Sequence, residues 1–154
     1  MRWLVDSFGA RIFSIFSEAE NTRELKARIP QVLDIVREFA SRLQKGDVPI
    51  ENLVITRSLS KNPNEYSHRV PQAIAAALLK TNGGTVHAGQ QIRYILTLDM
   101  KNNETTATAP ELAEKNTVFA SGRYIDLLIS STANLLLPLG YDKNTLTRIL
   151  RREE

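Results

Sequence analysis

The stretch from Leu53 to Leu96 most constrains the fold, because it alternates strand-like and helix-like patterns with two turn sequences. Leu53 to Ser58 alternates apolar and polar residues, as a strand with one buried face does. Pro71 suits the first turn of a helix, and the alanine- and leucine-rich run after it stops at Gly83-Gly84. Gln91 to Leu98 is a second strand pattern. We therefore expect strand, polar turn, helix, glycine turn and strand, with the two strands paired.

Two helices are predicted before this stretch. Apolar residues recur at three- and four-residue spacings from Trp3 to Ala19, which indicates an amphipathic helix. Asn21 followed by Glu24 has the form of a capping box, and the apolar stripe that follows ends at Gly46. Pro30 lies inside that stripe. Because proline removes a backbone donor and clashes with the preceding turn, we expect the helix to restart there.

A polar loop and two helices are predicted after it. The residues between Asp99 and Asn116 show little periodicity and are rich in Thr, Asn, Lys and Glu, which favours a solvated loop. Ser121 suits the cap of a last long helix that ends near Pro138-Leu139-Gly140. Asn144 is the expected cap of a short terminal helix.

Together these elements predict an α+β fold class that is mainly helical, a helix bundle with a small antiparallel β element. The chain has no internal repeats and no linker composition, so residues 1–154 are expected to form a single domain. Its expected parts are a helical hairpin, a strand-helix-strand core, a polar loop and C-terminal helices, at residues 1–46, 47–98, 99–120 and 121–154.

Composition excludes several classes of protein. The absence of cysteine excludes disulfide scaffolds, thiolate metal sites and cysteine nucleophiles. Charged residues interrupt the first twenty positions, and no apolar run reaches the length of a membrane span, so we expect neither a signal peptide nor a membrane partner. A cytoplasmic location is the default. The net charge of +3 allows a nucleic-acid partner without requiring one.

Candidates for catalysis are few. His68 and His87 are the only histidines, they lie in different turns, and neither has a carboxylate at ligand spacing. The glycines at 83, 84 and 89 are not followed by the Gly-Lys-Ser/Thr of a phosphate loop, so they are expected to be turn glycines. We find no Asp-x-Asp cluster after a strand. The sequence therefore predicts no catalytic or metal residue in this chain.

Cationic and hydroxyl side chains gather in and around the turn that follows the first strand. Such groups bind phosphate backbones. The cations are Arg57, Lys61, Arg69, Lys80 and Arg93, and the polar residues among them are Ser58, Ser60, Tyr66, Ser67 and Gln72. The alternative is a set of scattered, solvated charges. For Tyr66 the alternative to DNA contact is a ring packed under the turn with its hydroxyl bonded to backbone.

The same stretch resembles the thumb domain of family B DNA polymerases of the archaeal and eukaryotic replicative kind. The matching motifs occur in the family's order, as Leu53-Val54-Ile55, Leu59 and Tyr66, Pro71 with Ala73 and Ala76, Gly83-Gly84, Ala88-Gly89, and Tyr94-Ile95. Weaker matches lie outside it, at Arg2-Trp3, Ala10-Arg11, Pro49, Tyr124-Ile125 and Gly140-Tyr141. The resemblance spans nearly the whole chain and implies a polymerase-thumb-like fold.

The chain departs from the family in two places. Asp99 to Asn103 replaces the family's Gly-Asp-Arg loop, so contacts of that loop do not carry over. Fingers, exonuclease and palm, with the palm's Asp-Thr-Asp metal site, are missing, so this chain is not expected to polymerise by itself. Met1 matches a position almost at the palm-to-thumb junction. The resemblance therefore implies a separate small subunit of a split archaeal-type enzyme, or a cloned fragment.

As a thumb, the chain is expected to grip the primer-template duplex for DNA synthesis and to be associated with the nucleoid. Its partner in a heterodimer is a large subunit with exonuclease, palm and fingers, whose active site holds Mg²⁺; this chain needs no cofactor. The expected duplex contacts are Arg57, Ser60, Lys61, Tyr66, Ser67, Arg69 and Gln72, with Lys80 and Arg93 as further candidates. The expected interface with the large subunit is Trp3, Phe8, Ile12 and Phe16. The alternative is a stand-alone nucleic-acid-binding or interaction module with this fold and no polymerase role.

Overall fold

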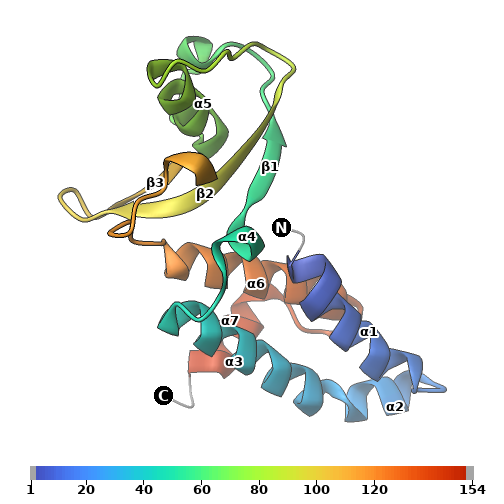
Figure 1. Ribbon diagram of the computed structural model, residues 1–154. Helices are drawn as coiled ribbons and strands as arrows, with labels where there is room; N and C mark the ends of the chain where they lie inside the picture. Colours follow the sequence, from blue (N-terminus) through green and yellow to red (C-terminus); the bar gives the residue numbers. More distant parts are fainter. Residues whose placement is uncertain (1–2, 152–154) are drawn as a thin grey trace. The chain divides into compact units, whose positions relative to one another are not determined.

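The computed structural model describes residues 3–151, which form two compact units (Figure 1). The sheet unit comprises residues 48–120, which joins the predicted strand-helix-strand core and polar loop. The helical unit comprises residues 3–47 and 121–151, which joins the predicted helical hairpin and C-terminal helices. The predicted fold class is confirmed, since the chain is mainly helical and has a small antiparallel sheet.

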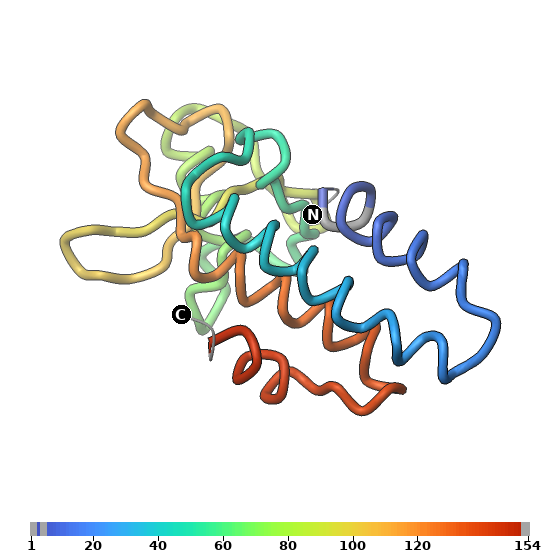
Figure 2. Tube along the Cα trace, turned by 90° about the horizontal axis from the view of Figure 1, so that it is seen from below, coloured from blue at the N-terminus to red at the C-terminus, as the bar shows by residue number. Residues whose placement is uncertain are grey.

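In the helical unit, short helices and turns surround two long helices, α3 and α6, which lie side by side (Figure 2). The elements are a π-helical segment Leu4–Gly9, α1 (Ala10–Ser17), α2 (Thr22–Ala27), α3 (Ile29–Lys45), α6 (Ser121–Leu136), a 3₁₀ turn Leu137–Leu139 and α7 (Lys143–Arg151). None of the helices among residues 3–151 is both long enough and apolar enough to cross a membrane.

The predicted helix boundaries around Pro30 are confirmed. The Asn21 side chain accepts a hydrogen bond from the Glu24 backbone N at 3.0 Å and caps α2. Arg28 separates α2 from α3, and Pro30 lies in the first turn of α3, where its missing N–H costs nothing. Gly46 ends α3 with φ of 72°, a left-handed conformation that glycine adopts without strain.

Asp142, and not Asn144, caps the last helix. The Thr145 backbone N donates to Asp142 Oδ1 at 2.7 Å, and this bond is the largest cause of the lowered pKa of Asp142. Asn144 lies inside α7. Both side chains suit a cap, and the sequence alone offered no way to choose between residues two positions apart.

Phe39 of α3 organises the core of the helical unit. Its ring centroid lies 4.9 Å from that of Trp3 and 5.4 Å from that of Phe8, the latter in an edge-on arrangement. The guanidinium carbons of Arg11 and Arg42 lie 5.5 and 5.9 Å from the Phe39 centroid. The N-terminal segment is thus held to α3 by aromatic packing with cations at its edge.

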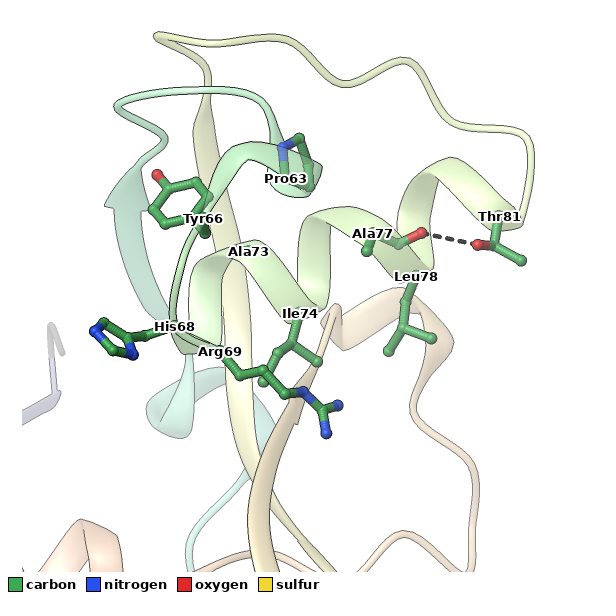
Figure 3. A pocket seen from close by; sticks show the side chains of 9 residues that line it. All are labelled: Pro63, Tyr66, His68, Arg69, Ala73, Ile74, Ala77, Leu78 and Thr81. Carbon is green, nitrogen blue, oxygen red and sulfur yellow. Dashed lines mark hydrogen bonds between the residues drawn. The ribbon is translucent and has the colours of Figure 1, made fainter.

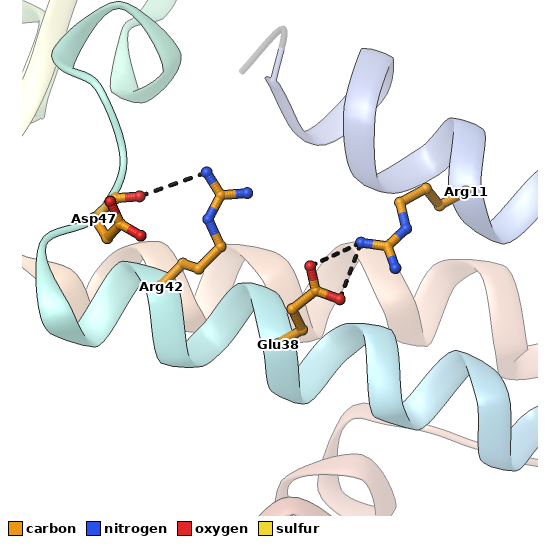
Figure 4. Close-up of polar contacts among 4 residues, drawn as sticks. All are labelled: Arg11, Glu38, Arg42 and Asp47. Carbon is orange, nitrogen blue, oxygen red and sulfur yellow. Dashed lines mark hydrogen bonds and ion pairs between the residues drawn. The ribbon is translucent and has the colours of Figure 1, made fainter.

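Those cations also have hydrogen-bond partners (Figure 4). One Arg11 nitrogen donates to both carboxylate oxygens of Glu38, at 3.0 and 3.1 Å, and this bond is the main cause of the lowered pKa of Glu38. An Arg42 nitrogen donates to the Asp47 carbonyl at 3.5 Å. These exposed pairs fix the positions of the guanidinium groups beside the aromatic rings and contribute little stability of their own.

The apolar stripe of the first segment, which was expected to form the interface with the large subunit, is largely covered by the chain itself. Trp3, Phe8 and Ile12 are each no more than 5% exposed, and Phe16 is half-buried. The large exposed apolar side chain of α1 is Phe13, at 73%. A partner contact on this first segment therefore has Phe13 and Phe16 available, and not Trp3, Phe8 or Ile12.

In the sheet unit, a three-stranded antiparallel sheet in the order β1-β2-β3 is combined with helix α5 (Figure 1). The elements are α4 (Ile50–Leu53), β1 (Ile55–Ser58), a 3₁₀ turn Pro63–Glu65, α5 (Pro71–Thr81), β2 (Gln91–Asp99), β3 (Glu104–Thr108) and a 3₁₀ turn Pro110–Leu112. The predicted helix at Pro71 and the pairing of the two predicted strands are confirmed. Leu53 belongs to α4, so the first strand is shorter than expected.

The polar segment from Asp99 to Asn116 contains a strand that the sequence reading missed. β3 pairs antiparallel with β2, with Ala107 opposite Leu96 and almost completely buried. The polarity of its threonines favoured the loop prediction, but threonine is β-branched and suits a strand. At the connecting turn the Asp99 carboxylate accepts from Asn102 Nδ2 at 2.8 Å, the largest cause of the lowered pKa of Asp99. The expectation of a solvated loop is therefore wrong for residues 104–108.

Candidate nucleic-acid interface

The cationic turn, residues 59–70, connects β1 to α5 and begins on a buried anchor. Leu59 is 1% exposed, and both its backbone groups are bonded to the turn that precedes β2. The Leu59 N donates to the Gln90 carbonyl at 2.9 Å, and the Leu59 carbonyl accepts from the Gly89 N at 2.7 Å. These bonds continue the β1-β2 ladder beyond the strands, so the start of the cationic turn has a fixed position.

Tyr66 braces the same turn from within. Its hydroxyl accepts a hydrogen bond from the Ser60 backbone N at 2.9 Å and lies 3.2 Å from Ser60 Oγ. Its bonds with Ser60 are the main cause of the lowered pKa of Tyr66. The Lys61 ammonium lies 5.2 Å from the Tyr66 ring centroid. The structure thus agrees with the packing interpretation of Tyr66, in which the hydroxyl is bonded to backbone.

A capping box closes the middle of the turn. The Asn62 backbone N donates to the Glu65 carboxylate at 2.9 Å, and the Glu65 backbone N donates back to Asn62. With Leu59 buried and Tyr66 bonded to Ser60, the segment from 59 to 66 is ordered by its own hydrogen bonds. Ser60 and Lys61 are therefore presented on a preorganised support.

Replacing Tyr66 by phenylalanine is expected to loosen the turn while leaving the rest of the sheet unit folded. The variant removes the hydroxyl that accepts the Ser60 amide hydrogen bond, so the Ser60 N–H loses its protection. Amide hydrogen exchange followed by NMR is expected to show at least about tenfold faster exchange at Ser60. Exchange in β2 stays unchanged. Equal protection of Ser60 in both proteins contradicts the bracing role.

All nine residues predicted to contact DNA belong to the sheet unit, and none of them is buried. Arg57, Ser60, Ser67, Arg69, Lys80 and Arg93 are exposed, and Lys61, Tyr66 and Gln72 are half-buried. Their accessibility agrees with a role at a surface. Their directions differ, so they do not form one surface.

The strand register separates Arg57 from Arg93. Arg57 lies opposite Ile92, and Arg93 lies opposite Thr56. Directly opposed residues share a face of the sheet, and neighbours along a strand alternate, so the two arginines project from opposite faces. Arg57 shares its face of the sheet with Tyr94. Burial raises the pKa of the Tyr94 hydroxyl, and the hydrogen bond from Arg57 partly offsets that rise. Arg93 lies 3.9 Å from Glu111.

Arg69 has acidic neighbours that the sequence reading did not foresee. It lines a small polar cavity of about 130 Å³ together with Asp99 and Glu104 of the β2-β3 hairpin. On the other side it borders a groove of about 290 Å³ along α5, where His68 and Arg69 extend in different directions (Figure 3). Carboxylates beside a guanidinium reduce its attraction for a phosphate. We therefore expect Arg69 to contribute less to anion binding than Lys61.

The turn at residues 86–90 was missed as part of the candidate site. Sequence reasoning treated Gly89 as a turn glycine, and its φ of 84° confirms that role. The same turn is bonded to Leu59 and so lies beside Ser60. Antiparallel pairing of the two predicted strands was the signal that could have found it, because that pairing brings the residues before the second strand next to those after the first.

Among residues 3–151, no group of three or more His, Asp or Glu side chains is arranged to hold a metal ion. The charged groups of the candidate interface are instead mostly cationic. An anionic polymer is the ligand class that such a surface suits.

The fold and the site together define an α+β protein with an ordered cationic turn on its sheet unit. Residues 5–139 match the model of DNA polymerase family B, and the chain belongs to that family. Its solved structural relatives include the family B DNA polymerase from the hyperthermophilic archaeon Pyrobaculum calidifontis. That match has a TM-score of 0.60 and 22% sequence identity, and it covers 79% of this chain and 16% of the other.

Curated relatives include two polymerases of Aeropyrum pernix. DNA polymerase 1 is 25% identical over 139 residues, which is 90% of this chain and 14% of the relative. DNA polymerase 2 is 33% identical over 69 residues, which is 45% of this chain and 9% of the relative. The chain thus spans a small fraction of the length of the polymerases that it matches.

Proposed function

We propose that this chain is the thumb of a family B DNA-directed DNA polymerase and that it grips the primer-template duplex during DNA synthesis. Membership of the family supports a polymerase role. The ordered motifs from Leu53 to Ile95 support the thumb in particular. The observation that carries the proposal is the cationic turn, which is held by buried Leu59 and by the Tyr66 hydroxyl.

Duplex binding by this surface needs no recognition of bases. Lysine and arginine attract phosphates, and serine hydroxyls donate hydrogen bonds to phosphate oxygens. Such contacts hold the duplex in place without sequence preference, which lengthens the time that a polymerase stays on its template. Because the turn is already ordered, little conformational entropy is lost when it meets the duplex.

The duplex contacts that we propose centre on the cationic turn and the adjoining strand end. Arg57, Ser60, Lys61 and Ser67 form this central group, and Tyr66 supports it through Ser60. Gln72 and Lys80 lie on α5, with Lys80 nine residues along the helix, roughly 13 Å from its start. Arg69, next to Asp99 and Glu104, and Arg93, on the opposite face from Arg57, are secondary contacts.

The active site of the proposed polymerase is carried by another polypeptide. This chain spans 14% of the length of Aeropyrum pernix DNA polymerase 1. We propose a heterodimer with a large subunit that contains exonuclease, palm and fingers. Its Mg²⁺ would be held by carboxylates of that subunit, because the described residues of this chain do not offer a suitable group.

The test is reconstitution of primer extension. A family B polymerase large chain that lacks the region matched here is mixed with this chain in equal amounts, and extension of a labelled primer is measured at single-nucleotide resolution. We expect a stoichiometric complex on size exclusion and products at least about tenfold longer per binding event than with the large chain alone.

The controls separate the proposal from its alternative. The Arg57→Ala/Lys61→Ala variant is expected to enter the complex but not to lengthen the products. A chain that binds duplex DNA alone, yet neither joins the large chain nor changes extension, would instead be a stand-alone nucleic-acid-binding module. Absence of duplex binding by both the chain and the complex rejects the thumb role outright.

A further inference from the structure

His87 lies in the turn that hydrogen bonds join to the cationic turn. The Leu59 N–H donates to the Gln90 carbonyl and the Gly89 N–H to the Leu59 carbonyl, so residues 86–90 run beside the segment that leads into Ser60 and Lys61. The turn has its own internal bond, because the His87 backbone N donates to Gln90 Oε1 at 3.1 Å. The His87 side chain is exposed. His87, whose backbone is fixed by these bonds, therefore lies at the same end of the sheet unit as Lys61.

The hydrogen bond of the His87 ring determines which ring nitrogen carries the hydrogen in the neutral form. Nδ1 lies 2.9 Å from the Ala88 carbonyl oxygen. A carbonyl oxygen only accepts hydrogen bonds, so Nδ1 must be the nitrogen that carries the hydrogen. In the neutral ring Nε2 then has a lone pair and no hydrogen, and it has no hydrogen bond to offer an anion. Only the protonated ring presents an N–H at Nε2.

We propose that residues 86–90 form a second phosphate-contacting element of the interface, in which protonated His87 donates from Nε2 to a phosphate oxygen of the duplex. This inference rests on the proposed function. A proton from solvent joins Nε2 when the contact forms, and the phosphate's negative charge favours the charged ring. Duplex binding is therefore coupled to uptake of one proton and strengthens as the pH falls.

Apart from His68, the charged groups around His87 do not offer another explanation for such a pH dependence. The cationic turn carries Lys61, Glu65, Tyr66 and Arg69, and the adjoining strands carry Arg57 and Arg93. Ordinary lysine and arginine side chains titrate well above pH 8, and carboxylates well below pH 5.5. The pKa of Tyr66 is lowered from the ordinary tyrosine value of about 10, chiefly by its hydrogen bonds with Ser60. His68 is the other histidine of the chain. It lies within the cationic turn, next to Arg69, where it borders the groove along α5, so His68→Gln tests whether this histidine causes the pH dependence instead.

The experiment measures the affinity of the full chain for a primer-template duplex by fluorescence anisotropy at about pH 8 and about pH 5.5, over a series of salt concentrations. We expect the dissociation constant of the wild-type chain to fall about fivefold to tenfold on acidification. The slope of log affinity against log salt is expected to steepen by about 0.9, the contribution of one added phosphate contact. His87→Gln should abolish both changes, and His68→Gln should keep both.

The outcomes distinguish this inference from the function on which it rests. A pH effect that persists in His87→Gln, or that His68→Gln removes, overturns the role of His87. Binding of equal strength at both pH values overturns it as well, while leaving duplex binding intact. Failure of the wild-type chain to bind duplex at either pH rejects the duplex-gripping function itself. Both substitutions place an uncharged glutamine at an exposed turn position, so the His87→Gln and His68→Gln variants are expected to fold like the wild type.

Discussion

Replacing Phe39 by alanine is expected to lower the free energy of unfolding of the helical unit by about 3–5 kcal/mol, the usual cost of removing a buried phenylalanine. Phe39 is 1% exposed and lies in α3, so the removed ring leaves a cavity that the helix backbone cannot close. A loss of this size is a large part of the stability of an ordinary domain.

The neighbours of Phe39 explain why this position is expected to be so sensitive. Trp3 and Phe8 both pack on its ring, and the guanidinium groups of Arg11 and Arg42 lie against it. Without that ring the aromatic contacts that hold the N-terminal segment to α3 are lost together. We therefore expect this segment to detach before the remaining helices unfold.

Urea denaturation followed by far-UV circular dichroism measures the effect, and Phe13→Ala is the matched control. Phe13 is 73% exposed, so its replacement is expected to change stability by no more than about 0.5 kcal/mol. Tryptophan fluorescence of Trp3, the only tryptophan, reports on the N-terminal segment separately. Similar stability losses in both variants would show that burial at Phe39 is not what stabilises this unit.

Local signals in the sequence predicted most of the helical boundaries. Pro30, Gly46 and Pro71 each act through the backbone of their own turn, so their effect is the same in almost any tertiary setting. The segment Glu104–Thr108 behaved differently. It became a strand because β2 offered it a pairing edge and a buried position for Ala107, and neither condition is visible in the local pattern.

The candidate site was predicted less completely than the fold. Residue types and spacing identified the cationic turn, since lysine, arginine and serine suit phosphates wherever they are exposed. The side on which each one projects depends on strand register, and it was the register that separated Arg57 from Arg93. The acidic surroundings of Arg69 depend on the β2-β3 hairpin, which was not expected to be a hairpin at all.

The Arg57→Ala/Lys61→Ala variant is expected to bind a primer-template duplex about tenfold to hundredfold more weakly than the wild type at moderate salt. Both residues belong to the central group of proposed contacts, and each is expected to neutralise one phosphate. The slope of log affinity against log salt should therefore decrease by about 1.8, from two contacts of about 0.9 each. Lys61→Ala alone is expected to produce about half of that decrease.

A second double variant shows whether the loss of duplex affinity is caused by the position of the two charges or by the lower net charge of the chain. Arg23→Ala/Lys26→Ala removes the same two charges from exposed positions on α2, in the helical unit. If the cationic turn makes the phosphate contacts, this control keeps nearly all of the affinity and the salt slope, because charges that do not neutralise a phosphate release few counterions. Equal losses in the two double variants would mean that the chain attracts DNA through its overall charge, without a defined contact surface. A loss of slope confined to Arg57→Ala/Lys61→Ala, unaffected by changing the duplex sequence, is the result that a phosphate-gripping turn requires.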